Sequence, residues 1–240
     1  MGDGIEVRPL RSLEDVRAAS ALFDRIWQER RVMGAPLLRA MAAHGGQVLG
    51  AFDGHDLVGA LVGLVGLTED GRPILHSHIT GVAPDVQLRG VGFLLKQAQR
   101  DWCLARGIDG VTWTMDPMVA RNARFNLHKL GAVADRFHRD YYGPMDDAFN
   151  RGERSDRLEI RWELRSERVE RAMAGSPPEP PGHGVELVPV PEDYHGLRAR
   201  DPEAARRWRE DVADALEKAF AEGRRAIGFL RHGAYVLEQA

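Results

Sequence analysis

The junction between an apolar segment and a helix-like segment, residues 82–92, constrains the fold of this chain most. The apolar run from Ile79 to Val82 is typical of the end of a β-strand, and apolar residues after Gly90 recur at helical spacing. Glycine allows close backbone approach and unusual dihedral angles. The first turn of a helix leaves amide N–H groups without internal partners and carries partial positive charge. The junction therefore predicts an anion cradle suited to a pyrophosphate.

The spacing of polar residues and glycines sharpens this prediction. Five residues after Val82 the chain continues as Gln87-Leu88-Arg89-Gly90-Val91-Gly92, in which Arg89 adds a full positive charge. The segment lacks the Lys-Ser/Thr pair of a P-loop and the third glycine of a dinucleotide fingerprint. A glycine-punctuated turn that only joins a strand to a helix is the alternative interpretation.

This motif, with its flanking strand and helix, resembles the coenzyme A loop of the GNAT superfamily of N-acetyltransferases, whose pattern is Q/R-x-x-G-x-G/A. The resemblance covers about residues 4–165. It implies an α/β (α+β) GNAT fold, with a mixed, mostly antiparallel twisted sheet flanked by helices. It also implies binding of acetyl-CoA or another short acyl-CoA by Val82 and by the residues from Gln87 to Gly92. Asn122 and Asn126 match asparagines near the pantetheine and diphosphate arm, although a helix cap and a polar helix face explain them equally well.

Hydrophobic periodicity and turn residues predict the element order strand, two helices, three strands, helix, strand, helix and two strands. Ser12 followed by Asp15 is typical of a helix N-terminus, and Pro36 opens a second helix that stops at Gly45. The expected strands are 5–10, 47–52, 57–67, 74–82, 110–115, 132–142 and 157–164, and the later helices are 91–105 and 119–130.

The C-terminal third of the chain has a different composition. Prolines and glycines between residues 175 and 182 predict that 166–184 is a linker after a GNAT domain at 1–165. The extension at 185–240 shows a strand, a helix at 202–222 and a hairpin around His232-Gly233. We expect one buried face on this helix, formed by Ala205, Trp208, Val212, Leu216 and Phe220. So short a segment has little core of its own. We therefore expect it to dock on the first domain or, in a homodimer, on the partner subunit.

Composition narrows the classes of partner. The net charge of −3 and the pI near 6.3 give no electrostatic reason to expect nucleic acid or an anionic membrane as partner. The sequence shows no apolar run of bilayer length, and the N-terminus lacks the pattern of a signal peptide. The single cysteine, Cys103, cannot form an intramolecular disulfide, which favours a cytoplasmic protein. Its place in the middle of a helix favours an incidental role.

Two histidines precede the cradle on the same expected strand. In part of the family a catalytic Glu stands six residues before the strand-end Val, and that position here is His76. A histidine, with an ordinary pKa near 6.5, is suited to accept a proton from an ammonium substrate. His78, Thr80 and Val82 share its face if no bulge intervenes, so His78 is the second candidate. A structural histidine is the competing interpretation, and a metal site lacks a third ligand.

The general acid departs from the family pattern. GNAT enzymes often place a Tyr on the helix after the fifth strand, and the matching residue here is Leu127, which cannot donate a proton. Either the thiolate leaves unassisted, or Tyr141 or Tyr142 takes over; half-buried strand aromatics are the alternative. In the family the backbone N–H at the position of Val82 faces the thioester carbonyl.

The strand at 110–115 is expected to line the other side of the pantetheine, through Trp113, Thr114 and Met115. Asp116 follows directly. Its carboxylate is suited to hold a substrate ammonium or orient His76, and capping of the next helix is the alternative.

Several motifs resemble a bacterial and archaeal GNAT subgroup of predicted acetyltransferases, among them Leu75-His76-Ser77-His78, Arg121-Asn122-Ala123 and Ser155-Asp156-Arg157-Leu158. The resemblance implies an N-acyltransferase that acts on a small amine or amino acid by direct attack on the thioester. The alternatives are an amino-acid N-succinyltransferase that uses succinyl-CoA, a non-catalytic acyl-CoA-binding module, and a protein-lysine acetyltransferase.

Overall fold

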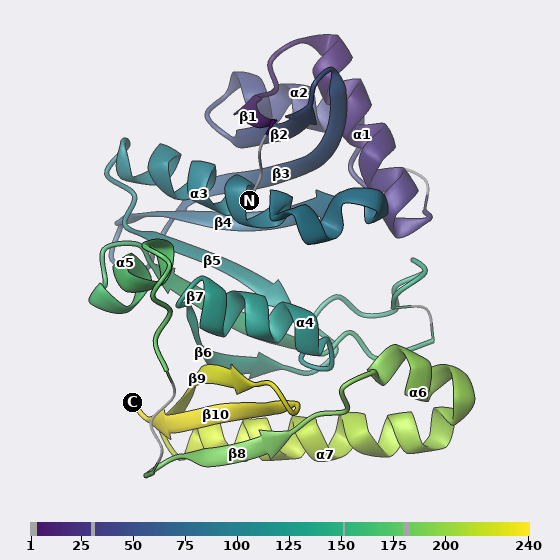
Figure 1. Cartoon of the computed structure of the whole chain (residues 1–240), viewed down its shortest axis with the longest axis vertical. Helices are drawn as coiled ribbons and strands as arrows, with labels where there is room; N and C mark the ends of the chain where they lie inside the picture. The colour runs from purple at the N-terminus through teal and green to yellow at the C-terminus, as the bar shows by residue number, and fades with distance from the viewer. Residues whose placement is uncertain (1–3, 30–31, 151, 180–182) are drawn as a thin grey trace. The chain divides into compact units, whose positions relative to one another are not determined.

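The computed structural model describes residues 4–29, 32–150, 152–179 and 183–240 (Figure 1). Their contacts divide the chain into two compact units. The first comprises Met1–Val111 and Met145–Gly152, and the second comprises Thr112–Pro144 and Glu153–Ala240. This division differs from the expected boundaries at residues 165 and 185, because the C-terminal extension shares a unit with the strands before it.

The first unit contains most of the expected N-terminal elements. Its elements are β1 (Ile5–Pro9), α1 (Leu13–Trp27), α2 (Ala35–Ala43), β2 (Gln47–Asp53), β3 (Asp56–Leu67), β4 (Pro73–Val82), the 3₁₀ helix η1 (Pro84–Arg89) and α3 (Val91–Leu104).

Local sequence signals explain where these elements begin. The Ser12 Oγ accepts a hydrogen bond from the backbone N–H of Asp15 at 2.9 Å, and the Asp15 carboxylate accepts one from the Ser12 N–H at 3.2 Å. This reciprocal cap is the one that the sequence predicts for α1. The Arg8 guanidinium bonds the same carboxylate and, despite partial burial, lowers the pKa of Asp15 to about 2.

The strands of the first unit pair antiparallel in the order β1-β2-β3-β4. Helices α1 and α3 pack against opposite faces of this sheet: a Cβ on Gly81 of β4 would meet Ile26 of α1 at 2.8 Å, whereas one on Gly59 of β3 would meet Val91 of α3 at 2.9 Å. A continuous apolar core joins the helices to the sheet and includes Leu10, Phe23, Leu38, Leu61 and Leu95.

The second unit begins within β5 (Gly110–Met115). Its strands follow the order β5-β7-β6-β9-β10-β8. The remaining elements are α4 (Ala120–Ala123), the π-helical turn η2 (Arg124–Lys129), β6 (Val133–His138), β7 (Arg157–Glu163), α5 (Glu167–Met173), β8 (Glu186–Pro189), α6 (Tyr194–Arg200), α7 (Pro202–Ala221), β9 (Arg224–Leu230) and β10 (Ala234–Gln239).

Part of the stretch expected as a linker is helical. Ser166 caps α5 through its side chain, which accepts a hydrogen bond from the Val169 N–H, and both Val169 and Ala172 are buried. The first proline or glycine after Ser166 is Gly175, so nothing in the preceding residues breaks a helix. The linker expectation therefore fails for residues 167–173.

The C-terminal extension continues the sheet of the second unit. β9 pairs antiparallel with β6 through Ala134 and Ala226, and β10 pairs with both β9 and β8 (Figure 1). The buried face of α7 differs from the expected one, because Trp208 and Phe220 are half-buried while Arg209 and Ala213 are buried. A periodicity argument assigns arginine to the solvent face, so it misses a buried guanidinium whose partners come from elsewhere in the chain.

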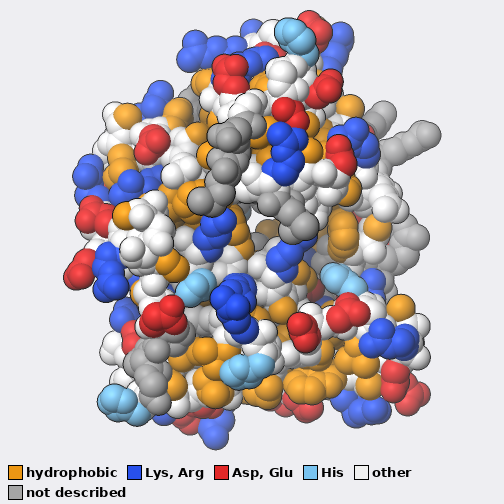
Figure 2. All heavy atoms as spheres, viewed as in Figure 1, with side chains coloured by type: hydrophobic (Ala, Val, Ile, Leu, Met, Phe, Trp, Pro, Cys, Tyr) orange, Lys and Arg blue, Asp and Glu red, His pale blue; other side chains and the backbone are white. Residues whose placement is uncertain are grey.

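Together these elements form an α/β fold, and the observed order through β7 is the expected one. On the face in Figure 2, basic and acidic side chains are interspersed, in keeping with the small net charge of −3. In the part of the chain that the structure describes, no helix combines the length and apolar content that crossing a bilayer requires. The expected homodimer stays a prediction.

Candidate active site

The loop between β4 and α3 forms the geometry that the glycine motif predicts. Pro84 opens η1, and Gly90 follows it with a φ of 82°, in the left-handed region that favours glycine. The Gly90 carbonyl accepts hydrogen bonds from the N–H groups of Phe93 at 3.0 Å and Leu94 at 3.1 Å, which starts α3. The N–H groups of Val91 and Gly92 occupy the first two helical positions, where the helix offers no acceptor. A Cβ at Gly90 would meet no atom within 4 Å, so the space beside this amide cradle is open.

The end of β4 presents the backbone group that the resemblance assigns to the thioester. The Ala83 N–H donates to the Val58 carbonyl of β3 at 2.8 Å. Because successive N–H groups in a strand point to opposite edges, the Val82 N–H points away from β3. The Gln87 side chain donates to the Val82 carbonyl at 3.4 Å and so ties the loop to the strand end.

The charge of Arg89 is shared with an acid of the same unit. The Arg89 guanidinium pairs with the Asp53 carboxylate at the end of β2, an ion pair that raises the pKa of Arg89 and lowers that of Asp53. Arg89 therefore adds less net charge to the cradle than the sequence predicts. The side chain of Leu88 lies outside the described part of the chain.

A bulge in β4 interrupts the expected alternation of side chains between the two candidate histidines and Val82. Residue pairs with β3 shift between Ile79 and Ser77, which leaves His78 as the extra residue. His76 consequently shares a face with Gly81, the face against α1, while the Val82 side chain lies on the α3 face. The role of Val82 concerns its backbone N–H in the sheet plane, so His76 remains a candidate.

The two imidazole rings lie 5.9 Å apart. His76 is half-buried and His78 is exposed, although the surrounding protein desolvates His78 enough to lower its pKa. A lowered pKa favours the neutral imidazole, the form that accepts a proton.

A buried lysine under β4 is a feature that the sequence analysis misses. Lys96 of α3 is only 4% exposed, and its Nζ donates to the Ser77 Oγ at 2.9 Å and to the Gln99 Oε1 at 3.0 Å. The Gln99 amide donates in turn to Gln47 of β2 at 2.9 Å. Burial lowers the pKa of Lys96 to about 7. The sequence signal for this burial is the position of Lys96 on the apolar face of the helix.

In the second unit, one of the two candidate tyrosines is anchored to β5. The hydroxyl groups of Tyr142 and Thr114 lie 2.9 Å apart, at hydrogen-bond distance, and the Tyr142 N–H donates to the Ser155 Oγ at 2.9 Å. The Tyr142 side chain is 44% exposed. Tyr141 is exposed as well and stacks edge-on against Tyr142, with ring centroids 4.7 Å apart.

The helix that follows β5 departs from α-helical geometry. Its second part, η2, is a π-helical turn, a form that often marks functional sites. Asn126 is buried there, and its Nδ2 donates to the Met115 sulfur at 3.1 Å, whereas Asn122 is exposed. Leu127 is fully buried, which closes the position of the family tyrosine to any polar role. Trp113 is buried edge-on against Trp162 of β7, so the face of β5 that carries Trp113 is tightly packed.

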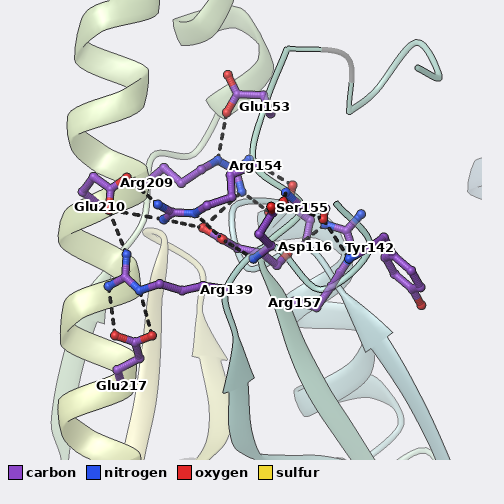
Figure 3. A network of polar contacts seen from close by, with 12 residues as sticks. Asp116, Arg139, Tyr142, Glu153, Arg154, Ser155, Arg157, Arg209, Glu210 and Glu217 are labelled. Carbon is purple, nitrogen blue, oxygen red and sulfur yellow. Dashed lines mark hydrogen bonds and ion pairs between the residues drawn. The ribbon is translucent and has the colours of Figure 1, made fainter. Parts of the chain in front are cut away.

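Asp116, at the end of β5, holds an unexpected partner. Its Oδ2 accepts a hydrogen bond from Arg209 at 3.0 Å, and its Oδ1 accepts one from the same guanidinium at 3.3 Å (Figure 3). The Oδ1 also accepts the Met118 N–H at 2.9 Å, an Asx-turn bond. Asp116 does not cap the next helix, because the N-cap of α4 is Val119, whose side chain makes no capping hydrogen bond. The structure therefore brings Asp116 together with α7, 93 positions later in the sequence.

Arg209 is the centre of a wider polar network (Figure 3). Its Nε donates to Glu153 at 2.8 Å. The same Nε donates to the Tyr194 hydroxyl at 3.1 Å. Next to it, Arg154 bonds the fully buried Asp156 at 2.6 Å and Glu210 of α7 at 2.7 Å. Glu153 and Arg154 each lie 56 positions before the residue of α7 that they contact, so no motif predicts the network.

Two other expectations concern reactive groups. Cys103 is fully buried, and burial raises the pKa of its thiol to about 12, so it is a poor nucleophile. Among the residues with described positions, no group of three or more His, Cys, Asp or Glu side chains could hold a metal ion.

The fold is similar to those of solved GNAT acetyltransferases. An acetyltransferase of the GNAT family from Streptococcus pneumoniae aligns with a TM-score of 0.55 and 14% identity, over 65% of this chain and 98% of that one. The ribosomal-protein-S18-alanine N-acetyltransferase of Escherichia coli aligns with a TM-score of 0.51 and 16% identity, over 67% and 94%. Naa50 of Arabidopsis thaliana, solved with the bisubstrate analogue CoA-Ac-MVNAL, aligns with a TM-score of 0.53 and 15% identity, over 66% and 97%.

No family model and no curated protein matches the sequence. At these identities the solved structures establish the fold and nothing finer. The resemblance drawn from the glycine motif is thus confirmed: this chain has the fold of the GNAT acetyltransferases.

Proposed function

We propose that this chain is an acyl-CoA-dependent N-acyltransferase, with acetyl-CoA as the expected donor and a small amine or amino acid as acceptor. The cradle between β4 and α3 carries the proposal. It combines a left-handed Gly90, open space where a side chain would stand, and the first amides of α3, which have no acceptor within the helix. These features fit a pyrophosphate, and the GNAT fold places such a loop after its fourth strand.

The donor would supply an acyl group activated as a thioester. The chain's own residues would bind and orient it: the amides of Val91 and Gly92 hold the diphosphate, and Gln87 keeps the loop against the strand. The Val82 N–H, directed away from β3, would donate to the thioester carbonyl oxygen at the strand end. The proposed assignment of Asn122 and Asn126 to the pantetheine arm rests on the resemblance alone.

Attack on the thioester requires a neutral amine, so the ammonium must first lose a proton. We assign this proton to His76, with His78 as the second candidate. A new C–N bond then forms as the C–S bond breaks, and the thiolate takes up a proton. Tyr142 is the better of the two tyrosines for this last transfer, because Thr114 holds its exposed hydroxyl at β5.

A binding module without turnover is the second candidate function. The buried Leu127 favours it, since the family's usual proton donor is absent. Succinyl-CoA remains an alternative donor, and peptides with a free N-terminus join the acceptor candidates because Naa50 was solved with a CoA–peptide conjugate.

A steady-state assay of thiol release separates these functions. Acetyl-CoA and succinyl-CoA would each be offered with n-butylamine, spermidine, L-phenylalanine and a tetrapeptide with a free N-terminus. An N-acyltransferase releases CoA faster with at least one amine than without any. Tight binding of acyl-CoA with no amine-dependent release would identify the binding module instead.

A further inference from the structure

The C-terminal extension forms hydrogen bonds with two adjacent residues that follow β5. Arg209 of α7 holds the Asp116 carboxylate with two nitrogens, at 3.0 and 3.3 Å. Tyr235 of β10, which is fully buried, donates from its hydroxyl to the Pro117 carbonyl at 2.7 Å. Both residues lie beyond the part of the chain, about residues 4–165, that resembles the family. The position of Asp116 is therefore set by a segment that the family fold does not include.

The charges of the cluster leave the Asp116 carboxylate with net negative charge, which can attract a further cation. Arg209 is only 5% exposed; burial acts to lower the pKa of its guanidinium, but Asp116 and Tyr194 together outweigh this effect and raise the pKa. Glu153, 10% exposed, bonds the same guanidinium on its Nε. Asp156 lies 3.9 Å from the same guanidinium and also pairs with Arg154. Three carboxylates thus share Arg209, so Asp116 is only partly neutralised.

Asp116 also retains access and hydrogen-bonding capacity. Its side chain is 17% exposed, in contrast to the buried Arg209. Each carboxylate oxygen can accept two hydrogen bonds. Among the described contacts the Oδ1 accepts two and the Oδ2 accepts one, from Arg209, so the Oδ2 can take one further donor.

The energetic cost of the arrangement points away from a purely structural role. A buried ion pair often contributes no more stability than apolar side chains of similar volume would. Arg139, by contrast, directly follows β6 and binds the same helix through Glu217 at 2.7 Å and Glu210 at 2.8 Å, both of which are exposed. Anchoring α7 is thus already served by a second arginine that does not contact Asp116.

We propose that the Asp116 Oδ2 binds the ammonium group of the acceptor, and that Arg209 is the positioning residue that orients this carboxylate. Acceptor recognition would then depend on the C-terminal extension. The proposal rests on the proposed N-acyltransferase function for the identity of the acceptor, but the predicted contact is a binding contact and can be measured without turnover.

The test is the calorimetric affinity of the full-length protein, saturated with CoA, for n-butylamine, spermidine and L-phenylalanine. Arg209→Lys keeps the charge but loses the two-nitrogen fork. We expect it to weaken binding of the preferred amine by about 10- to 100-fold, the range for a misplaced orienting group. Its affinity for CoA should stay as in the wild type. Arg139→Lys is the matched control, because Arg139 pairs with acids of the same helix without contacting Asp116, and it should change neither affinity.

Asp116→Asn is the second variant, in case Arg209→Lys disturbs folding. It should lose the same amine affinity, and combining the two substitutions should add little, because both act on one contact. Equal amine affinity in the wild type, Arg209→Lys and Asp116→Asn overturns the proposal, as does a wild type that binds none of the amines. Amine binding that fails in these variants without any turnover in the wild type would support this contact while rejecting the acyltransfer reaction.

Discussion

The cradle at Gly90 and the cluster around Arg209 are two polar sites built in opposite ways. The cradle consists of consecutive residues, and its functional groups are backbone amides set by one left-handed glycine. The cluster consists of side chains from β5, the segment before β7, and α7, which converge from positions 116, 153 and 209. Local geometry creates the first site, and tertiary packing creates the second.

The difference predicts different sensitivity to substitution. A site of backbone amides tolerates changes of side chain but not a change of backbone conformation or of the adjacent space. A site of buried charges tolerates backbone changes nearby but not the loss of one partner, which leaves a charge without compensation. Substitutions of each kind therefore test whether the two sites differ in this way.

The largest effect should come from Gly90→Glu. The substitution strains a left-handed backbone and directs a negative charge at the phosphate position. Loss of two charge-assisted hydrogen bonds, each about 1.5–3 kcal/mol, weakens binding by roughly a thousandfold, so acetyl-CoA affinity should fall below detection by calorimetry. Gly107→Glu is the control, because Gly107 is in the same unit, has a φ of 70° and also has open space beside it. Equal losses in both variants would mean that strain, and not the cradle, is responsible.

A smaller effect is expected for His76→Ala, which removes the proposed proton acceptor. General bases contribute about 10²- to 10⁴-fold to rate, so turnover at pH 7 should fall within this range while acetyl-CoA affinity is retained. The defect should shrink as the pH rises, since more of the amine is then neutral without help. His78→Ala is the paired variant, and the larger loss identifies the base. Wild-type turnover in both variants across pH 6 to 9 would exclude both histidines.

The smallest effect concerns the contribution of Lys96 to the free energy of unfolding. Lys96 belongs to a buried polar network on α3, the helix that begins at the cradle. Its folded pKa of about 7 lies below that of an unfolded lysine, near 10.4, because burial disfavours the charge. Between these values the unfolded state binds more protons, so the free energy of unfolding should rise with pH, by up to about 2–3 kcal/mol from pH 7 to 9.

Urea unfolding of Lys96→Met at both pH values should show this rise removed, while Lys218→Met, at an exposed position of α7, should retain it. A rise of the same size in Lys96→Met and the wild type would assign the pH dependence to other groups.

The same contrast explains what could be predicted from the sequence. The cap at Ser12, the stop at Gly45, the element order through β7 and the strand–loop–helix junction at Gly90 all depend on neighbours within a few residues. Such features can be predicted from the sequence because turns, caps and periodicity depend on neighbouring residues.

Three features that the sequence does not predict share one physical cause, which is contact with residues elsewhere in the fold. The bulge at His78 depends on register with β3, and the buried face of α7 depends on acids at positions 116 and 153. Lys96 is buried because Ser77 and Gln99 satisfy its donors. Helix α5 was missed for a simpler reason, since the prolines after residue 175 dominated a stretch whose first half contains none.

The central claim is that the cradle binds the diphosphate of an acyl-CoA. Its most direct test is to titrate the wild-type protein with acetyl-CoA and with acetyl-pantetheine, which carries the same thioester without the diphosphate, at two salt concentrations. We expect acetyl-CoA to bind at least about a hundredfold more tightly, and we expect salt to weaken the binding of acetyl-CoA only. Equal affinity for the two compounds would contradict the claim.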